Sequence, residues 1–410
     1  MSTHYTRAVA LAAAMLPALA AAAPLTLTQA LDLAVKRSEA TRAARAGVAS
    51  ASESARAASQ LPDPTLRAGV DNLPVTGRDR LSTTRDSMTM KRISISQEWV
   101  SAEKRAALQA AADAMVGRKS VSVQVAAAEA RLQTALAYLD AYFAGETLKL
   151  TTLSEHHVHE ELEAAKARLA SSTGSSQDVL AASGARGRAE DESAEVKQQQ
   201  SIARVALERW MGVPADELTA PTELASTDEP GFIANHPMVL AAQRDIELAR
   251  QEAALAATNR KPNWSWEVSY GQRTGYSDMV SFGVSIPLPL SPAERQDRET
   301  ASKLALVDKA EGTLAEATRA AQGEFRSLDS DTRLLTDRIQ RYRSSVVVPA
   351  QQRTAAALAG YRSNQVTLLA LFEARHMEVE AQRKLLNLQR DLAKAQAQLV
   401  YKPLVNGGAR

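Results

Sequence analysis

The fold is decided by the stretch WSWEVSYGQRTGYSDMVSFGVSI, residues 264–286. Apolar and polar side chains alternate there with a period of two, on either side of a short turn at residues 272–277. The apolar positions are Trp264, Trp266, Val268 and Tyr270 before the turn, and Val280, Phe282, Val284 and Ile286 after it. This alternation predicts a β-hairpin with one apolar face and one polar face.

A second hairpin is predicted earlier in the chain, so the sequence indicates a two-fold internal repeat. Residues 38–70 align without a gap with residues 236–268, and Pro64 falls on Pro262. The earlier strands lie within residues 64–99, around a polar insert, and a change of parity at Lys91 suggests a bulge. Farther along, the alignment continues with residues 175–186 on residues 364–375.

Each predicted hairpin is flanked by long helices. A helix precedes each one, at residues 28–60, with Thr28 as a candidate cap, and at residues 233–259. The run at residues 101–170 has no proline and would span about 105 Å as a helix. Its counterpart begins at residue 292 and is expected to be interrupted at Pro349.

The composition fits long helices better than an ordinary enzyme core. Aromatic residues make up only 4% of the chain, and alanine supplies much of the apolar content, so close-packed seams of small residues are expected. The formal net charge of +2 gives no basic field for nucleic acid. The absence of cysteine excludes thiolate metal sites and a lipidated N-terminal cysteine.

The first residues are predicted to be a secretory signal. Arg7 precedes an apolar run that ends in four alanines, Ala20 to Ala23. A charge, an apolar run and small residues follow one another in this order in secretory signals. We therefore expect residues 1–23 to be removed and the mature chain to be exported.

Strands of about nine to twelve residues in an exported chain suggest a membrane barrel, because a tilted strand of ~9–11 residues crosses a bilayer core. Aromatic side chains form girdles at the interfaces of such barrels; the candidates are Trp99, Trp264, Trp266, Tyr270 and Phe282. Four strands cannot close a barrel, so other copies must complete it, and three copies would give twelve strands. The alternative is a small soluble sheet buried against helices.

Three segments resemble the TolC family of outer-membrane efflux proteins. They are TLTQALDLAVKRS at residues 26–38, GYRSNQVTLLALFEAR at residues 360–375 and SIPLPLSPAER at residues 285–295. The last resembles the strand-to-helix junction of the heavy-metal, CzcC-like branch. The segments stand in the order and with the doubled spacing of the family, and the resemblance covers essentially the whole mature chain.

The resemblance implies a mainly α fold with a small β part. Each protomer would add four strands to a trimeric 12-stranded transmembrane β-barrel and long helices to a coiled-coil barrel across the periplasm. The chain would be a passive channel in the outer membrane of a Gram-negative bacterium. It would contact lipid, a periplasmic adaptor and an inner-membrane pump of the resistance-nodulation-division type, and it would need no cofactor.

The expected organisation is as follows: a signal peptide at 1–23; a first repeat at 24–211 with its hairpin at 64–99; an equatorial linker at 212–231; a second repeat at 232–401 with its hairpin at 262–288; and a tail at 402–410.

The two helical turns are the expected docking surface for the adaptor; the residues concerned are Gly174, Ser175, Tyr361 and Asn364. Asn364 stands where the family usually has glycine, and asparagine tolerates the left-handed conformation. Glu373 matches the family's constriction acid, whereas the family's second acid falls here on Ala370. Three copies of Glu373 would form a cation-selective ring. The alternative is an ordinary surface carboxylate on the face of Arg375.

A histidine cluster is the other candidate site. His156, His159 and Glu160 share a helical face at a spacing that metals can use. The alternative is a solvated helix face, and no resident metal is expected.

The sequence leaves two other functions open. The same channel could carry drugs or secreted polypeptides, or the chain could be a soluble periplasmic coiled-coil scaffold. No phosphate-binding loop or catalytic constellation is found in the sequence, so an enzyme is not expected.

Overall fold

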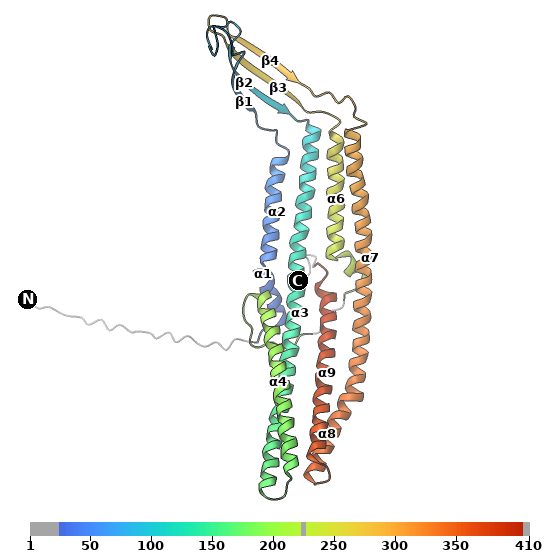
Figure 1. Ribbon diagram of the computed structural model, residues 1–410. Coiled ribbons are helices and arrows are strands. Elements are labelled where there is room, and N and C mark those ends of the chain that lie inside the picture. The colour runs from blue at the N-terminus through green and yellow to red at the C-terminus, as the bar shows by residue number, and fades with distance from the viewer. Residues whose placement is uncertain (1–23, 223–226, 405–410) are drawn as a thin grey trace, which may run out of the picture.

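The computed structural model describes residues 24–222 and 227–404, and the predicted signal lies outside them. The described chain is a long rod with a small sheet at one end and two helical turns at the other (Figure 1). The predicted fold class, mainly helical with four antiparallel strands, is confirmed. The C-terminal helix ends near the middle of the rod.

Both halves of the chain follow the same order of helices and strands. The first half contains α1 (Leu27–Arg37), α2 (Glu39–Ala58), β1 (Thr65–Asp71), β2 (Met90–Trp99), α3 (Ala102–Ala170) and α4 (Ser176–Met211). The second contains α5 (Glu229–Ala234), α6 (Pro237–Thr258), β3 (Trp264–Gln272), β4 (Met279–Ser285), α7 (Gln296–Tyr342), the π-helical segment η1 (Arg343–Val347), α8 (Val348–Arg362) and α9 (Leu368–Tyr401).

The predicted first helix is two helices. The cap of α1 is Thr26, not Thr28, and it forms a reciprocal capping box with Gln29. The chain then breaks at Ser38, which is extended, and its hydroxyl accepts a hydrogen bond from the Thr41 N–H at 3.1 Å. A serine that can cap a new helix offers the backbone an alternative to continuing the old one.

The interruption predicted at Pro349 takes the form of a π-helical segment and not of a break in the helix. The chain stays helical from Gln296 to Arg362, and η1 ends at Val347, two residues before the proline. Proline has no N–H and its ring displaces the carbonyl four residues earlier. A wider π turn at this point accommodates that displacement within a continuous helix.

The sheet has the order β1-β2-β3-β4, so the two hairpins lie side by side. Every pairing is antiparallel, and the register of β2 runs without interruption against both β1 and β3. The bulge expected at Lys91 is therefore absent. Regular pleating places Ile93, Ile95 and Trp99 on one face, with Gln97 as the polar member of that series.

Helix α3 contacts helices in both halves of the rod: α2 and α6 in one half, and α4 and α9 in the other. Its buried positions are mostly small residues, including Ala128, Ala130, Ala135, Ala137 and Ala141. Alanine lets helix backbones approach closely, which explains an extended core with few aromatics. Tyr138 is the aromatic residue buried on α3: it is fully buried, and its hydroxyl donates to the carbonyl of Leu25 at 2.7 Å.

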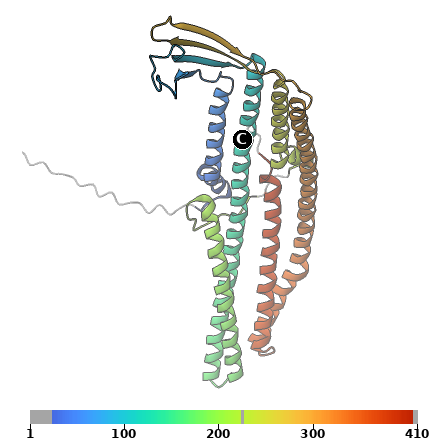
Figure 2. The same cartoon turned by 45° about the horizontal axis from the view of Figure 1, so that its top comes forward.

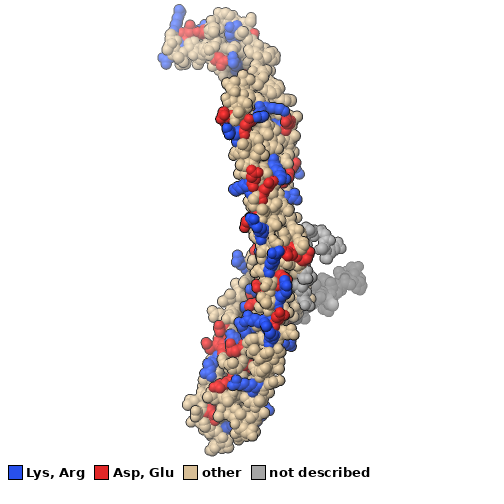
Figure 3. All heavy atoms as spheres, turned by 90° about the vertical axis from the view of Figure 1, so that its right-hand side faces the viewer, with Lys and Arg blue, Asp and Glu red and all other residues tan. Residues whose placement is uncertain are grey.

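Turning the top of the molecule forward shows the sheet bending away from the helix ends (Figure 2). Basic and acidic side chains are interspersed along the rod on the face seen in Figure 3. The rod therefore presents no large field of one sign on that face. The sheet and the two helical turns form the opposite ends of the rod.

Candidate functional site

The sheet carries its apolar face outward. The face contains Leu66, Ala68 and Val70 of β1, Ile93, Ile95 and Trp99 of β2, Trp264, Trp266, Val268 and Tyr270 of β3, and Val280, Phe282 and Val284 of β4. Phe282 is 80% exposed and Leu66 is 69% exposed. Leaving such side chains in water would cost about 1.5–3 kcal/mol each relative to burial.

The opposite face is polar, and its central part, on β2 and β3, is enclosed. Ser94 and Ser269, which pair with each other across β2 and β3, are both buried. Arg92 lies on the same face and forms an ion pair with Asp71 at 2.8 Å. A sheet that buries serine and exposes phenylalanine is arranged for an apolar surrounding on its outer side.

The predicted aromatic girdle is only partly at the ends of the strands. Trp99 and Trp264 meet at the helix end of the sheet with ring centroids 6.1 Å apart. Tyr270 lies near the opposite end, where its hydroxyl is hydrogen-bonded to Asp278. Phe282 instead pairs with Val268 in the middle of the sheet. The tryptophan pair therefore marks one edge of the apolar face, and Phe282 lies within it.

At the other end of the rod, the two helical turns share one hydrogen-bond pattern. The N–H groups of Thr173 and Gly174 donate to the carbonyl of Arg168, at 2.9 and 3.0 Å. The N–H groups of Gln365 and Val366 donate in the same way to the carbonyl of Gly360. Ser172 and Asn364 are the left-handed residues of the two turns, each with φ of 57°.

This pattern corrects the predicted alignment of the two halves. Ser172 corresponds to Asn364, and the cap of α4, Ser175, corresponds to the cap of α9, Thr367. The sequence alignment of Ser175 with Asn364 is thus displaced by three residues. Both turns are conformationally equivalent, and the expectation that Asn364 adopts the left-handed conformation is met.

Each turn has a close contact between the end of its first helix and the residue six positions later, and one of the two residues is glycine. The glycine is the later residue in the first turn and the earlier residue in the second. A Cβ at Gly174 would lie 2.9 Å from Cβ of Arg168 and 3.0 Å from its carbonyl carbon. In the second turn the glycine is Gly360, where a Cβ would lie 2.5 Å from Cγ2 of Val366. Gly174 is therefore required by close approach of the chain and not by a positive φ.

Arg168 connects the two turns. Its Nη2 donates to Oδ1 of Asn364 at 2.7 Å, and its guanidinium lies 4.9 Å from the ring centroid of Tyr361. The sequence singled out Tyr361 and Asn364, but it gave no reason to choose Arg168, which lies in another helix. The structure thus brings three of the tip residues into one contact between the α3–α4 hairpin and the α8–α9 hairpin.

A second link between these hairpins lies farther along the helices. Arg375 of α9 is 2.9 Å from the carboxylate of Glu161 of α3, and both side chains are largely buried. Burial raises the pKa of Glu161, and Arg375 only partly opposes that effect. Other basic residues of α9 face acidic residues of α3 and α4 in the same sense; these pairs are His376–Glu192, Arg383–Glu195 and Lys394–Asp140.

Glu373 points away from this interface. It is exposed, and its neighbour Arg375 is paired with Glu161 instead. Glu373 therefore does not share the face of Arg375, and its two possible roles, constriction acid and surface carboxylate, both remain predictions. Among the described residues, no basic side chain lies within ion-pair distance of Glu373.

The histidine cluster does not assemble as a three-ligand site. His156 and His157 both lie near Glu160, at 3.3 and 3.5 Å, whereas His159 is not part of that contact. Within residues 24–222 and 227–404, no group of three or more histidine or carboxylate side chains is arranged to hold a metal ion. The geometry fits a solvated helix face.

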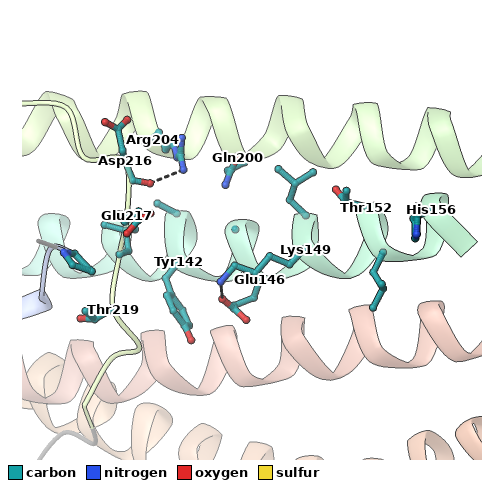
Figure 4. A pocket seen from close by; sticks show the side chains of 16 residues that line it. Tyr142, Glu146, Lys149, Thr152, His156, Gln200, Arg204, Asp216, Glu217 and Thr219 are labelled. Atoms are coloured by element: carbon teal, nitrogen blue, oxygen red, sulfur yellow. Dashed lines mark hydrogen bonds and ion pairs between the residues drawn. The ribbon is translucent and has the colours of Figure 1, made fainter. Parts of the chain in front are cut away.

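A groove of about 890 Å³ runs between α3, α4 and the segment after α4 (Figure 4). Two of its basic side chains are paired within the groove. Lys149 donates to Glu146 at 2.8 Å, and Arg204 donates to the carbonyl of Asp216 at 2.7 Å.

No helix within the described residues combines the length and the apolar character needed to cross a membrane. No protein-family model matches the sequence, and no curated protein matches it either. Solved structures do match. VceC, an outer membrane protein of Vibrio cholerae, is 19% identical, with a TM-score of 0.74 over 92% of this chain and 95% of that one.

Two further structures agree. The CmeC outer membrane channel of Campylobacter jejuni has a TM-score of 0.78 at 12% identity, over 94% of this chain and 87% of that one. CusC, described in terms of transmembrane channel formation, has a TM-score of 0.72 at 15% identity, over 92% and 91%. The fold is that of these outer-membrane proteins. Such low identities establish the fold alone.

Proposed function

We propose that this chain is the outer-membrane channel of a tripartite efflux system. Three copies would join edge to edge, β4 of one beside β1 of the next, and close a 12-stranded barrel. Because consecutive strands alternate in direction, β4 and β1 would also be antiparallel at each junction. The helices would continue the barrel as a tunnel across the periplasm of a Gram-negative bacterium.

The observation that carries this proposal is the outward apolar face of an open sheet. Within the described residues β1 and β4 each pair on one side only, so both edges of the sheet are unpaired. Unpaired strand edges are not tolerated in lipid, and a soluble scaffold would have no use for an exposed apolar sheet. Closure with further copies satisfies the edges and leaves the apolar face toward lipid.

The helical turns would dock a periplasmic adaptor, with Gly174, Ser175, Tyr361 and Asn364 in the contact surface. The adaptor would connect the channel to an inner-membrane pump of the resistance-nodulation-division type, which supplies the energy. Glu373 would line the tunnel just above the second turn. Three carboxylates facing one axis would select cations and narrow the passage.

Heavy-metal cations are the proposed cargo, on the resemblance of residues 285–295 to the metal-exporting branch. The histidines at 156 and 159 would at most touch passing ions, since a conduit gains nothing from tight binding. Expression with a metal-exporting pump and adaptor should restore metal resistance to a strain that lacks its own channel. Restoration of drug resistance alone, with a drug pump, would assign the cargo differently and leave the channel role intact.

The channel role itself is tested by assembly. The protein should remain with the outer membrane on fractionation, and native mass spectrometry in detergent should give a threefold assembly. A monodisperse monomer in detergent-free buffer would contradict the proposal.

A further inference from the structure

An apolar segment continues beyond the end of the sheet. Residues 286–290, IPLPL, follow β4 and are called here the strap. Ile286, Leu288 and Leu290 are 57%, 75% and 90% exposed. They keep the period-two spacing of Val280, Phe282 and Val284, so the apolar stripe of β4 runs on for six residues past Val284.

The strap has left the sheet. The last pair of β4 is Ser285 with Ser265, and no main-chain hydrogen bond to residues 286–290 is found among the described residues. Its alternate positions are Pro287 and Pro289, which have no N–H to leave unsatisfied. Large apolar side chains on a backbone with few donors are suited to an apolar surrounding, where each unsatisfied donor is costly.

The strap also supplies a missing length. β4 has seven residues, whereas a tilted strand needs ~9–11 to cross a bilayer core. β1, the strand that would lie beside it in the next copy, also has seven, and the chain before it carries Pro62 and Pro64. Proline at both edges prevents strand pairing at the helix end of this junction. Something other than a strand must meet the lipid there.

The residues on either side of the strap indicate its depth along the axis from the sheet to the helices. The register of β3 and β4 ends at Ser265 and Ser285, so Ile286 and Trp264 are the next residues of the two chains, and the ring of Trp264 packs against Trp99. Charged pairs follow at the helix ends, where Arg260 binds Asp297 and Lys261 binds Glu103. The strap lies between an aromatic pair and charged side chains, which is the sequence of environments at a membrane interface.

From this arrangement we infer that the strap contacts lipid acyl chains at the boundary of the leaflet nearest the helices. The inference rests on the proposed membrane channel. It adds a lipid-contact site outside the strands, and it makes Ile286, Leu288 and Leu290 the anchors that set how deep the barrel sits. A strap covered by a neighbouring copy, or standing in water, is the contrary arrangement.

Site-directed spin labelling tests this directly, because the chain has no cysteine. Labels are introduced singly as Ile286→Cys, Leu288→Cys and Leu290→Cys in the full chain, reconstituted in liposomes. Collision rates are then measured with oxygen, which partitions into lipid, and with a water-soluble nickel chelate. Phe282→Cys on the apolar face and Ser281→Cys on the polar face are the controls.

All three strap labels should give an oxygen-to-nickel collision ratio several-fold higher than the label at 281. The ratio should fall in the order 282, 286, 288, 290 as the chain approaches the interface. Nickel collisions at the strap equal to those at 281, or low collisions with both reagents, would overturn the inference while the label at 282 stayed in lipid. A label at 282 that collides freely with nickel would instead refute the membrane channel.

Discussion

Arg168 and Asn364 hold the two helical turns together across the tip of the molecule. Nη2 of Arg168 donates to Oδ1 of Asn364 at 2.7 Å, while the same guanidinium covers the ring of Tyr361. The asparagine is free to accept this bond because its left-handed backbone already forms the turn. One side chain of α3 therefore links the α3–α4 hairpin to the α8–α9 hairpin at this end of the rod.

Removing that side chain should loosen the tip. An exposed cation–π contact contributes ~0.5–1 kcal/mol and a hydrogen bond to a charged group ~1.5–3 kcal/mol, so Arg168→Ala should shift a closed-to-open equilibrium by roughly tenfold or more. Single-channel recording of the reconstituted protein should show longer open times. Lys166→Ala is the matched control, because Lys166 pairs only within its own helix, with Glu163 at 2.9 Å. Identical traces for both variants would mean that the Arg168 contact does not restrain the tip.

The glycines of the two turns should respond differently to substitution. Gly174→Ala places a Cβ against the main chain of Arg168 and Leu169, so a loss of ~1–3 kcal/mol is expected. Gly184→Ala, in the middle of α4 with open space around it, should be neutral or stabilising by up to ~1 kcal/mol. Thermal denaturation of the detergent-solubilised protein measures both.

The second turn offers a rescue that the first does not. At Gly360 the obstructing atom is a side-chain methyl of Val366, so Val366→Ala should restore most of the stability lost in Gly360→Ala. No side-chain truncation can relieve Gly174→Ala, since its clash is also with backbone. Additive effects of Gly360→Ala and Val366→Ala would show that the contact is not the source of the requirement.

Charge on the two faces of the sheet should have unequal effects. Val268 is on the apolar face between Ile95 and Phe282, so Val268→Asp should block assembly, at a cost below the ~2–4 kcal/mol of a basic residue at the midplane. Ser265→Asp lies on the polar face and should be tolerated. The yield of membrane-embedded trimer measures the difference. Equal yields would contradict the lipid-facing orientation.

Glu373 should determine ion selectivity near the periplasmic entrance. Glu373→Gln should lower the preference for cations and the block by trivalent cations, because three carboxylates would be lost from one ring. Glu316→Gln is the control, since Glu316 is an exposed partner of Arg319 on α7. Unchanged selectivity in Glu373→Gln would return Glu373 to an ordinary surface role.

Acid should loosen the attachment of the C-terminal segment at the middle of the rod. Burial lowers the pKa of His236, whose Nδ1 accepts from the Met238 N–H at 3.3 Å and whose Nε2 faces Glu324. Glu324 also binds Lys402, and the Leu404 N–H donates to the carbonyl of Asn235 at 2.8 Å.

The pKa of His236 in the folded protein lies below its unfolded value of about 6.5. The stability that neutral His236 contributes is therefore fully present above pH 6.5, and it is lost as the pH falls below that value. The loss reaches at most ~1.4 kcal/mol per pH unit for one proton. The protection factors of residues 399–404 in hydrogen exchange, which correct for the slower intrinsic exchange at lower pH, should fall between pH 7.5 and 5.5. His236→Asn, which keeps a capping acceptor but does not titrate, should remove this fall. An equal pH dependence in both proteins would exclude His236 as its source.

The local sequence determined the strands, the long helices and the chemistry of the turns. Alternation in residues 264–286 specifies a hairpin with two unlike faces, since side chains on a strand point alternately to either side. Long proline-free runs rich in alanine specify helices, and Asn364 specifies a left-handed turn. These properties depend on residues a few positions apart, so they can be predicted from the sequence without knowledge of the tertiary structure.

Only the tertiary structure decided which distant groups meet. Arg168 donates to Asn364, Arg375 pairs with Glu161, and His159 stays outside the contact of His156 with Glu160. The first two contacts depend on how the helices are rotated against one another. A helix face leaves that rotation open, because alanine seams allow close packing over many angles. The local pattern also left open whether the helix would break at Ser38 and continue through Pro349, because a capping serine and a proline are each compatible with either outcome. The structure has a break at Ser38 and a π-helical segment before Pro349.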